Sequence, residues 1–362
     1  MKKRWRDIGI IILLFCFWRL LLLSTEGAAP YLWPLQRTFL GPTHWANFDG
    51  VHYLSIIQFG YSQYQQAFFP LYPFFVQWVS WFFNIAPNRA ALEVSLLSFI
   101  AGLGIFYRLA KMENAKAAGW SVLLLLTFPA SFFFASAYTT SLYFLLAATT
   151  LFFMKTKRWF LAGVCGAFAS ATQLFGVFLF LAVGFEYFQQ KRRRLRDMLS
   201  ILIIPLGLLG YMGYLAKTVG DPLAFYHAQP LFGAERSANE IILLPQVLWR
   251  YIKIFTHSSM ETIQYWVAAL ELGTFLLAFW LLWRGMKEKI SSSYLFYSVA
   301  VILLPTLTGT LSSLPRYFLS AFPLFFVLGG MTSRAGKIVL AVLFSAGLIM
   351  ACSLFLQGYF VS

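Results

Sequence analysis

Long apolar stretches recur along almost the entire chain, and short clusters of lysine and arginine separate them. Hydrophobic residues make up 60% of the 362 residues, aromatic residues 19% and charged residues only 11%. A soluble protein carries about 25% charged residues, and a single soluble core stops growing near about 250–300 residues. A water-soluble globular enzyme is therefore excluded, and the pattern predicts an all-α protein that crosses a membrane many times.

Eleven apolar segments are long enough, or nearly long enough, to cross a bilayer as helices. The first runs from about Ile8 to Leu23 and resembles a signal peptide, but the weak cleavage site at residues 28–29 favours an uncleaved span. The others lie near residues 91–110, 118–136, 139–154, 159–172, 174–189, 198–217, 262–283, 293–310, 317–332 and 337–357. We therefore expect a polytopic protein of about 11 transmembrane helices (10–12) that forms a single domain over residues 1–362.

Residues 67–84 are also apolar, but two early prolines interrupt them. This segment could span the membrane, re-enter it or lie at its interface. The local sequence leaves these three possibilities open.

The net charge of +15 comes from 28 Lys and Arg against 13 Asp and Glu. In a soluble protein such an excess would indicate nucleic acid, whereas in a membrane protein basic residues mark cytoplasmic loops. The proposed cytoplasmic segments hold 20 basic residues, the proposed outer segments hold seven, and Arg19 lies within the first span. This bias predicts a cytoplasmic N-terminus and no nucleic-acid partner, and it disfavours a full crossing by residues 67–84.

Two long segments are expected on the outer side of the membrane. Residues 25–90 form a first loop with juxtamembrane helices, and residues 218–261 form a second loop. All four histidines fall in these loops, where chemistry is usually placed on a rigid scaffold. The histidines are His44, His52, His227 and His257. The three cysteines lie in apolar spans without CxxC spacing, which is typical of packing residues.

Asp49 lies between Phe48 and Gly50 in the first outer loop, and two roles are open for it. It could act as a general base that takes a proton from an attacking hydroxyl, or it could cap the helix predicted to start near Val51. His52 would share a helical face with it, and could orient the Asp49 carboxylate, contact substrate or bond to backbone. No DxD partner and no second ligand at i+4 accompany Asp49, so no metal site is predicted, while divalent-ion dependence stays open.

An aromatic and proline-rich block runs from Phe68 to Pro73 and includes Phe69 and Pro70. It could wall a lipid groove or simply start a kinked helix with an aromatic belt. Gln173 lies at the predicted turn of residues 170–173, between two basic clusters. There it could bind a sugar or phosphate, or it could join two helices as a satisfied amide.

Arg316 lies beside Tyr317 at the outer boundary of a predicted span. An arginine is well suited to bidentate phosphate binding, with snorkelling to lipid headgroups as the alternative. Glu271 lies within a predicted span, and its charge is costly there unless it is paired. We therefore expect Glu271 to face the interior of the bundle.

Taken in order, the motifs of the chain resemble those of the second mannosyltransferase of GPI-anchor assembly and its prokaryotic relatives, a family of the GT-C class. The resemblance covers roughly residues 1–330. It rests on Trp45-Ala46-Asn47-Phe48-Asp49-Gly50-Val51-His52-Tyr53, Gly60-Tyr61, Ala67-Phe68-Phe69-Pro70-Leu71-Tyr72-Pro73, Phe128-Pro129-Ala130-Ser131, Tyr138-Thr139-Thr140-Ser141-Leu142-Tyr143 and Pro315-Arg316-Tyr317. Its most specific part is Asp49 followed by the Phe-Phe-Pro-x-x-Pro block.

The resemblance implies a GT-C-like membrane glycosyltransferase with a polyprenyl- or dolichyl-phosphate sugar as donor, and the family name implies mannose as that sugar. It implies inverting transfer to a hydroxyl of a lipid- or protein-linked acceptor at the outer face of a bacterial plasma membrane. It implies Asp49 as the catalytic base, and Arg316 is our candidate for stabilising the leaving phosphate. No cofactor besides the lipid-linked donor is implied. The substrate-binding candidates are His52, Phe69, Pro70, Tyr138, Gln173, His227, Arg316 and Tyr317.

Two positions depart from the family pattern. Many relatives carry arginine where Gln173 stands, and the segment from Tyr138 to Ser141 lacks an acidic residue that relatives often have. Two alternatives to a transferase therefore stay open. A polyprenyl-phosphate or lipid flippase predicts midplane charges and internal repeats, of which Glu271 is the one strong charge that we find. An inactive subunit of a glycosylation complex predicts that Asp49 is dispensable.

Overall fold

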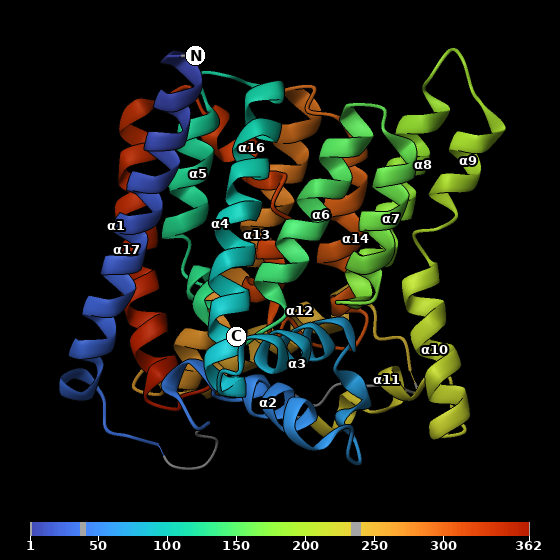
Figure 1. The fold of residues 1–362 in the computed structure, drawn as a ribbon. Coiled ribbons are helices and arrows are strands. Elements are labelled where there is room, and N and C mark those ends of the chain that lie inside the picture. Colours follow the sequence, from blue (N-terminus) through green and yellow to red (C-terminus); the bar gives the residue numbers. More distant parts are fainter. Residues whose placement is uncertain (1, 37–40, 233–239, 362) are drawn as a thin grey trace.

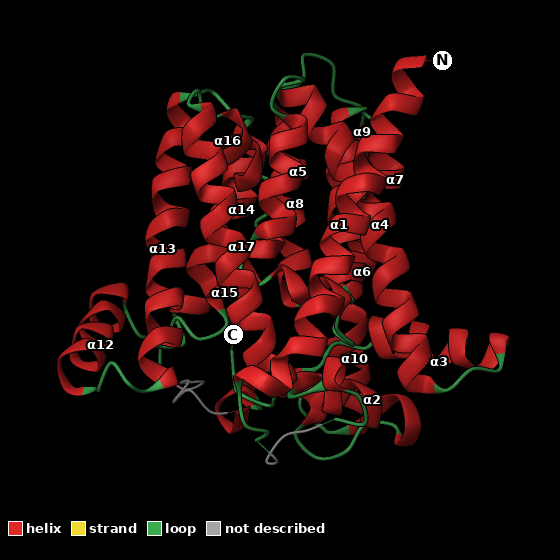
Figure 2. Cartoon of the chain, turned by 90° about the vertical axis from the view of Figure 1, so that its left-hand side faces the viewer, coloured by secondary structure: helices red, strands yellow, loops and turns green. Residues whose placement is uncertain are grey.

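The computed structural model describes residues 2–36, 41–232 and 240–361, and all the regular structure in these ranges is helical. Parts of both expected outer loops, residues 37–40 and 233–239, lie outside the described residues. The longer helices run side by side from one end of the molecule to the other, as Figures 1 and 2 show. The predicted all-helical architecture is confirmed.

Four continuous helices of the described chain are long and apolar enough to cross a bilayer. They are α1 (Lys2–Leu32), α4 (Pro87–Glu113), α13 (Ile263–Lys287) and α17 (Arg334–Leu356). A fifth candidate is broken, because α9 (Leu195–Ile201) and α10 (Leu206–Thr218) meet at an angle of 46°. Pro205 stands at this break, where its missing amide hydrogen and fixed ring interrupt a continuous helix.

The other apolar helices of the bundle are shorter than a bilayer is thick. They are α5 (Ala118–Thr127), α6 (Thr140–Lys155), α7 (Trp159–Ser170), α8 (Leu179–Phe188), α14 (Ser292–Thr306), α15 (Leu314–Ser320) and α16 (Leu324–Gly330). Short 3-10 helices extend two of them, η3 (Ser131–Ala135) after α5 and η4 (Leu174–Phe178) before α8. Each helix overlaps a segment expected to span, but the number of about 11 spans stays a prediction.

Several helices lie across one end of the bundle instead of along it. Figure 1 shows α2 (Asp49–Phe59), α3 (Leu71–Phe83) and α12 (Leu244–His257) in this lateral position, with α11 (Ala224–His227) at the same end. The segment 67–84 thus forms a helix of 13 residues, which is too short to span a bilayer. Trp78 and Trp81 lie on its exposed face, as is typical of a helix at a membrane interface.

The first helix is longer than the sequence predicted. Instead of ending near Leu23, α1 continues to Leu32, so the first outer loop starts after residue 32 and not at residue 25. Thr25 is buried and donates a hydrogen bond to the carbonyl of Leu21 (2.8 Å), and Ala29 is fully buried. These contacts keep a weakly helical stretch in helical form, because tertiary packing outweighs local propensity.

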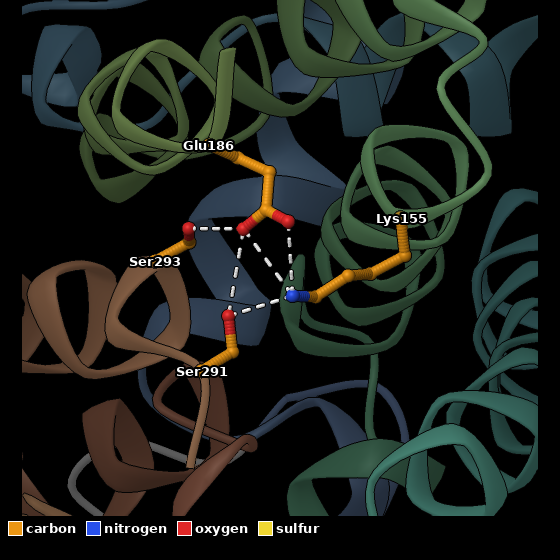
Figure 3. A network of polar contacts seen from close by, with 4 residues as sticks. All are labelled: Lys155, Glu186, Ser291 and Ser293. Atoms are coloured by element: carbon orange, nitrogen blue, oxygen red, sulfur yellow. Dashed lines mark hydrogen bonds and ion pairs between the residues drawn. The ribbon is translucent and has the colours of Figure 1, made fainter. Parts of the chain in front are cut away.

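A charged cluster holds three helices together at the end opposite the lateral helices. Lys155, at the end of α6, contacts both carboxylate oxygens of Glu186 on α8 at 3.2 Å and donates to Ser291 at 2.7 Å. Ser293 donates to Glu186 at 2.5 Å, as Figure 3 shows. We call Lys155, Glu186, Ser291 and Ser293 the Lys155 cluster. A polar depression of about 540 Å³ adjoins this cluster.

Glu271 of α13 faces the interior of the bundle, which confirms the prediction for this residue. Its side chain is buried and accepts a hydrogen bond from the hydroxyl of Tyr251 on α12. The same hydroxyl accepts a hydrogen bond from the amide of Leu311 at 3.2 Å. Glu271 therefore helps to fasten the lateral helix α12 to α13 and to the loop before α15.

Candidate active site

A cavity of about 360 Å³ opens at the end of the bundle that carries the lateral helices. Stretches of chain that are far apart in the sequence form its walls, from α2 to the segment after α17. Among the residues that line it are Asp49, Tyr53, Phe69, Tyr138, Thr139, Gln173, Phe225, Arg316, Tyr317 and Phe360. The combination of apolar rings with a few convergent polar groups is typical of a small-molecule site.

Asp49 is the first residue of α2, and its carboxylate faces Arg316. The Arg316 guanidinium donates a hydrogen bond to the carboxylate at 2.5 Å. The N-cap position of α2 is Phe48, and Asp49 makes no other side-chain hydrogen bond to the described residues. The capping alternative for Asp49 is therefore wrong, because its carboxylate serves an ion pair instead of the helix start.

Arg316 projects from the first turn of α15 into a cage of aromatic rings. Its guanidinium carbon lies 5.4 Å from the ring centres of Phe133 and Tyr138 and 5.6 Å from that of Tyr317. Such cation–π contacts fix the orientation of a guanidinium without using up its hydrogen-bond donors. Arg316 is thus held in place with donors left over for a ligand.

Both partners of this ion pair follow residues with strained backbone. Phe48 has a φ of 54° and a ψ of −116°, and Ser313, which precedes α15, has a φ of 66°. Residues other than glycine rarely adopt such positive φ angles, and each residue in this conformation costs on the order of 1–3 kcal/mol. The surrounding contacts maintain these backbone conformations. They direct the first turns of α2 and α15 toward the same cavity.

Tyr138 joins the loop directly before Asp49, residues 41–48, to the segment before α6. We call this loop the Asp49 loop. Its hydroxyl donates to the carbonyl of Asn47 at 2.8 Å, and the neighbouring amide of Ala137 donates to the carbonyl of Trp45 at 2.9 Å. The ring of Tyr138 also lines the cavity. Tyr138 therefore contacts Arg316 through its ring, and its hydroxyl holds the Asp49 loop at the cavity wall.

Gln173 lies at the turn between α7 and η4, as predicted. Its amide nitrogen donates to the Thr139 hydroxyl at 2.7 Å, and its amide oxygen accepts from Ser320 at 3.4 Å. Gln173 also lines the cavity. The side-chain amide of Gln173 thus joins neighbouring segments by hydrogen bonds, as one of the two alternatives predicted. Because Gln173 also lines the cavity, it is in a position to contact a ligand.

The aromatic block after α2 divides between cavity wall and helix start. Phe69 lines the cavity and packs against Tyr211 and Phe225 at ring distances of 5.2 and 5.5 Å. Pro70 is half-buried at the N-cap of α3 and is not among the lining residues. Tyr317 lines the cavity and meets Phe175 edge-to-face at 5.0 Å.

Neither candidate histidine lines the cavity. His52 stacks on the ring of Phe68 at 5.0 Å, and burial lowers the pKa of its imidazole, partly offset by the charge of Asp49. His227 on α11 points to Asp221 at 2.7 Å, and this hydrogen bond lowers the pKa of the Asp221 carboxyl. His52 lies near the cavity behind Phe68, whereas His227 is half-exposed beside it.

Several lining residues were not among the sequence candidates. Tyr53 and Thr139 belong to motifs of the family pattern, so their place in those motifs was a usable signal. Phe360 follows the last predicted span, and no local pattern distinguishes it from other phenylalanines. Within the described ranges, no three His, Cys, Asp or Glu side chains come together as metal ligands would.

Comparison with protein families finds a match to a mannosyltransferase family in part of the chain. Residues 33–207 match the family described as Mannosyltransferase (PIG-V). Over this range, which is slightly less than half of its length, the chain is similar to this mannosyltransferase family. The resemblance drawn from the sequence motifs is thereby confirmed, and the matched range contains Asp49 and Gln173 but ends well before Arg316. No curated protein matches the chain.

Comparison with solved structures identifies the fold. ArnT from Cupriavidus metallidurans bound to undecaprenyl phosphate is 12% identical, with a TM-score of 0.57 over 97% of this chain and 77% of that chain. Its apo state is 13% identical, with a TM-score of 0.53 over 95% and 77%. The apo Archaeoglobus fulgidus oligosaccharyltransferase is 9% identical, with a TM-score of 0.49 over 100% and 57%. The chain thus has the helical fold of GT-C membrane enzymes.

Proposed function

We propose that this protein is a membrane glycosyltransferase that moves a sugar, with mannose as the first candidate, from a polyprenyl- or dolichyl-phosphate donor to the hydroxyl of a lipid- or protein-linked acceptor. The observation that carries the proposal is the Asp49–Arg316 pair in the wall of an aromatic cavity. The pair offers a carboxylate and a guanidinium side by side. These are the two groups that a transfer from a phosphate leaving group requires.

The relationship to mannosyltransferases supports the choice of sugar, and the walls of the cavity support a lipid-linked donor. Phe69, Phe225, Leu304 and Pro305 give one side of the cavity an apolar surface that suits a polyprenyl chain. The GT-C-fold protein ArnT was crystallised with undecaprenyl phosphate, which is a lipid phosphate of this kind. Arg316, with donors beyond the one given to Asp49, suits the phosphate.

The proposed reaction is a single displacement with inversion. The acceptor oxygen attacks the anomeric carbon from the face opposite the phosphate, while the Asp49 carboxylate takes the proton of the acceptor hydroxyl. The bond between the anomeric carbon and the phosphate oxygen breaks, and its electron pair leaves with the phosphate. Arg316 stabilises the negative charge of that phosphate through charge-assisted hydrogen bonds.

The proposed topology has about 11 membrane crossings and an outward-facing site. The lateral helices and the cavity share one end of the bundle, and the Lys155 cluster lies at the other. The sequence segments rich in Lys and Arg belong to the Lys155 end, in line with cytoplasmic loops. In a bacterium this orientation puts the site at the extracytoplasmic face of the plasma membrane.

The test is transfer by Asp49 variants in membranes supplied with a labelled polyprenyl-phosphate sugar. Removal of a general base typically costs about 10²–10⁴-fold, so we expect Asp49→Asn and Asp49→Ala to lose transfer by this factor. Asp221→Asn is the matched control, because Asp221 lies at the same end outside the cavity. Transfer that survives both Asp49 substitutions would refute the proposal and favour a non-catalytic role.

A further inference from the structure

The chain turns back on itself directly after α17. Gly358 has a φ of 83°, which a glycine adopts without strain, and it follows the last turn of the helix. The amides of Gly358 and Tyr359 each donate to carbonyls of the last turn, Phe355 and Leu354, at 3.0 Å. The segment 359–361 therefore leaves the helix axis, and both views mark the C end inside the outline of the molecule (Figures 1 and 2).

The Asp49 loop is hydrogen-bonded to the last turn of α17, from which this segment returns. Asn47, which is fully buried, donates from its side-chain amide to the carbonyl of Phe355 at 2.8 Å and accepts from the amide of Gly41 at 3.0 Å. The amide of Gln36 donates to the carbonyl of Gln357 at 2.9 Å. The last turn of α17 is thus hydrogen-bonded to the Asp49 loop, and the side-chain amide of Gln36 donates to the Tyr359 hydroxyl in the returning segment at 3.1 Å.

Phe360 is the residue that this arrangement delivers to the cavity. It lines the cavity, and its side chain is 48% exposed although the next residue, Val361, is buried. Its ring meets the ring of Phe48 edge-to-face at 5.4 Å, and Phe48 is the residue before Asp49. An exposed aromatic ring therefore lines the same cavity as the proposed base and contacts the residue that precedes it.

The apolar residues suited to a lipid chain lie on other elements. Phe69 packs against Tyr211 of α10 and Phe225 of α11, and Leu304 and Pro305 belong to α14. Phe360 instead belongs to the segment after α17. The cavity thus has apolar lining residues from α11 and α14 and, from the segment after α17, the exposed ring of Phe360 against Phe48.

We propose that Phe360 is a specificity-determining residue that forms the acceptor wall of the site. The acceptor must present its hydroxyl to Asp49, and the ring of Phe360 offers a flat face on which a ring-bearing acceptor, such as a pyranose, stacks while it does so. The inference rests on the proposed function and leaves the bonds made and broken in the reaction unchanged. It adds a residue outside the family match of residues 33–207 to the recognition of the acceptor.

The test compares acceptors with and without a ring. The purified protein receives labelled polyprenyl-phosphate mannose with octyl α-mannopyranoside or with octanol, and transfer to water is measured without acceptor. For Phe360→Ala we expect the KM for the glycoside to rise about three- to tenfold, as loss of an aromatic contact predicts. The kcat, the use of octanol and the transfer to water should stay as in the wild type, and Phe360→Trp should retain the wild-type KM.

The control is Phe59→Ala, which removes an equally large exposed ring from the end of α2, outside the cavity lining. An unchanged glycoside KM in Phe360→Ala would overturn the inference. An equal loss with octanol or water would overturn it as well, because the ring would then serve the site as a whole.

A binding measurement separates this inference from the proposed reaction. Saturation-transfer NMR with octyl α-mannopyranoside reads the contact of its ring protons with the protein, with no need for catalysis. A signal that is lost in Phe360→Ala and retained in Phe59→Ala supports the acceptor wall even if the wild type transfers no sugar. An equal signal in the two variants contradicts it, whatever the result of the transfer assay.

Discussion

Two charge pairs of similar burial lie at opposite ends of the bundle and differ in their surroundings. The side chains of Arg316 and Asp49 are 16% and 27% exposed, and those of Lys155 and Glu186 are 16% and 25% exposed. Lys155 also bonds to Ser291, and Glu186 to Ser293. Among the described residues, the Asp49 and Arg316 side chains share one hydrogen bond and make no other.

The difference separates a pair that joins helices from a pair that is open to a ligand. In the Lys155 cluster, polar groups of three helices satisfy one another, and the adjoining depression is walled mainly by charged and serine side chains. At the other end, a guanidinium with five donors and a carboxylate with several lone pairs use one bond each and border a cavity with aromatic walls. Burial alone would not have distinguished the two.

The largest expected effect concerns the sides of the membrane on which the two ends lie. In a background with Cys16, Cys165 and Cys352 replaced by alanine, we introduce Gln63→Cys near the cavity end or Arg193→Cys near the Lys155 end. Both positions are exposed. An impermeant thiol reagent added outside intact cells should label only the cysteine at 63. Labelling of the cysteine at 193 alone would reverse the topology.

Arg316→Ala should nearly abolish use of the donor. Loss of one group that stabilises a developing negative charge costs about 10²–10³-fold in rate, and we expect a fall of this size. Arg316→Lys should recover part of it, because lysine keeps the charge but loses the planar fork. Arg89→Ala, a surface arginine at the start of α4, is the control. Donor kinetics of Arg316→Ala equal to those of the wild type would disprove the role.

Lys155→Met should affect stability instead of transfer. It leaves the partly buried Glu186 carboxylate without its counter-charge, which costs about 2–4 kcal/mol of unfolding free energy. The double variant Lys155→Met, Glu186→Leu should regain part of that loss. Thermal unfolding in nanodiscs measures both, and transfer per folded molecule should stay constant. A loss of specific activity without a loss of stability would contradict the structural role that we assign to the Lys155–Glu186 pair.

The smallest effect concerns backbone strain at the two ends. Ser313 near Arg316 and Lys289 near the Lys155 cluster both have positive φ, of 66° and 56°. Glycine relieves this strain but is more flexible when unfolded, so each glycine variant should gain at most about 1 kcal/mol. Only Ser313→Gly should raise the KM for the donor, because it loosens the first turn of α15. An altered KM in Lys289→Gly would contradict this expectation.

The sequence identified Asp49 and Arg316 separately, but their pairing could not be predicted. Each stood out because charges are scarce on the proposed outer side, whereas their contact depends on how α2 and α15 pack across a sequence separation of 267 residues. The turn at Gln173 was predictable because basic clusters on both sides require the chain to go out and return. Local spacing sufficed there, and at the ion pair it did not.

Other features depended on packing that leaves no local pattern. The extension of α1 to Leu32 relies on burial of Thr25 and Ala29, and the capping reading of Asp49 fails because a distant arginine takes its carboxylate. Phe360 reaches the cavity through a reversal at Gly358, directly after a helical turn that is hydrogen-bonded to the Asp49 loop. Single-residue patterns do not report such long-range contacts.

The long separation of Asp49 from Arg316 also has a consequence for biosynthesis. Ribosomes add about 5–20 residues per second, so the sequence separation of 267 residues corresponds to on the order of 13–50 s of translation. On the proposed topology, Asp49 reaches the outer face early and waits there without its counter-charge until α15 is inserted. On this topology, the ion pair that borders the cavity forms only after most of the chain has been made, so the site is completed late in synthesis.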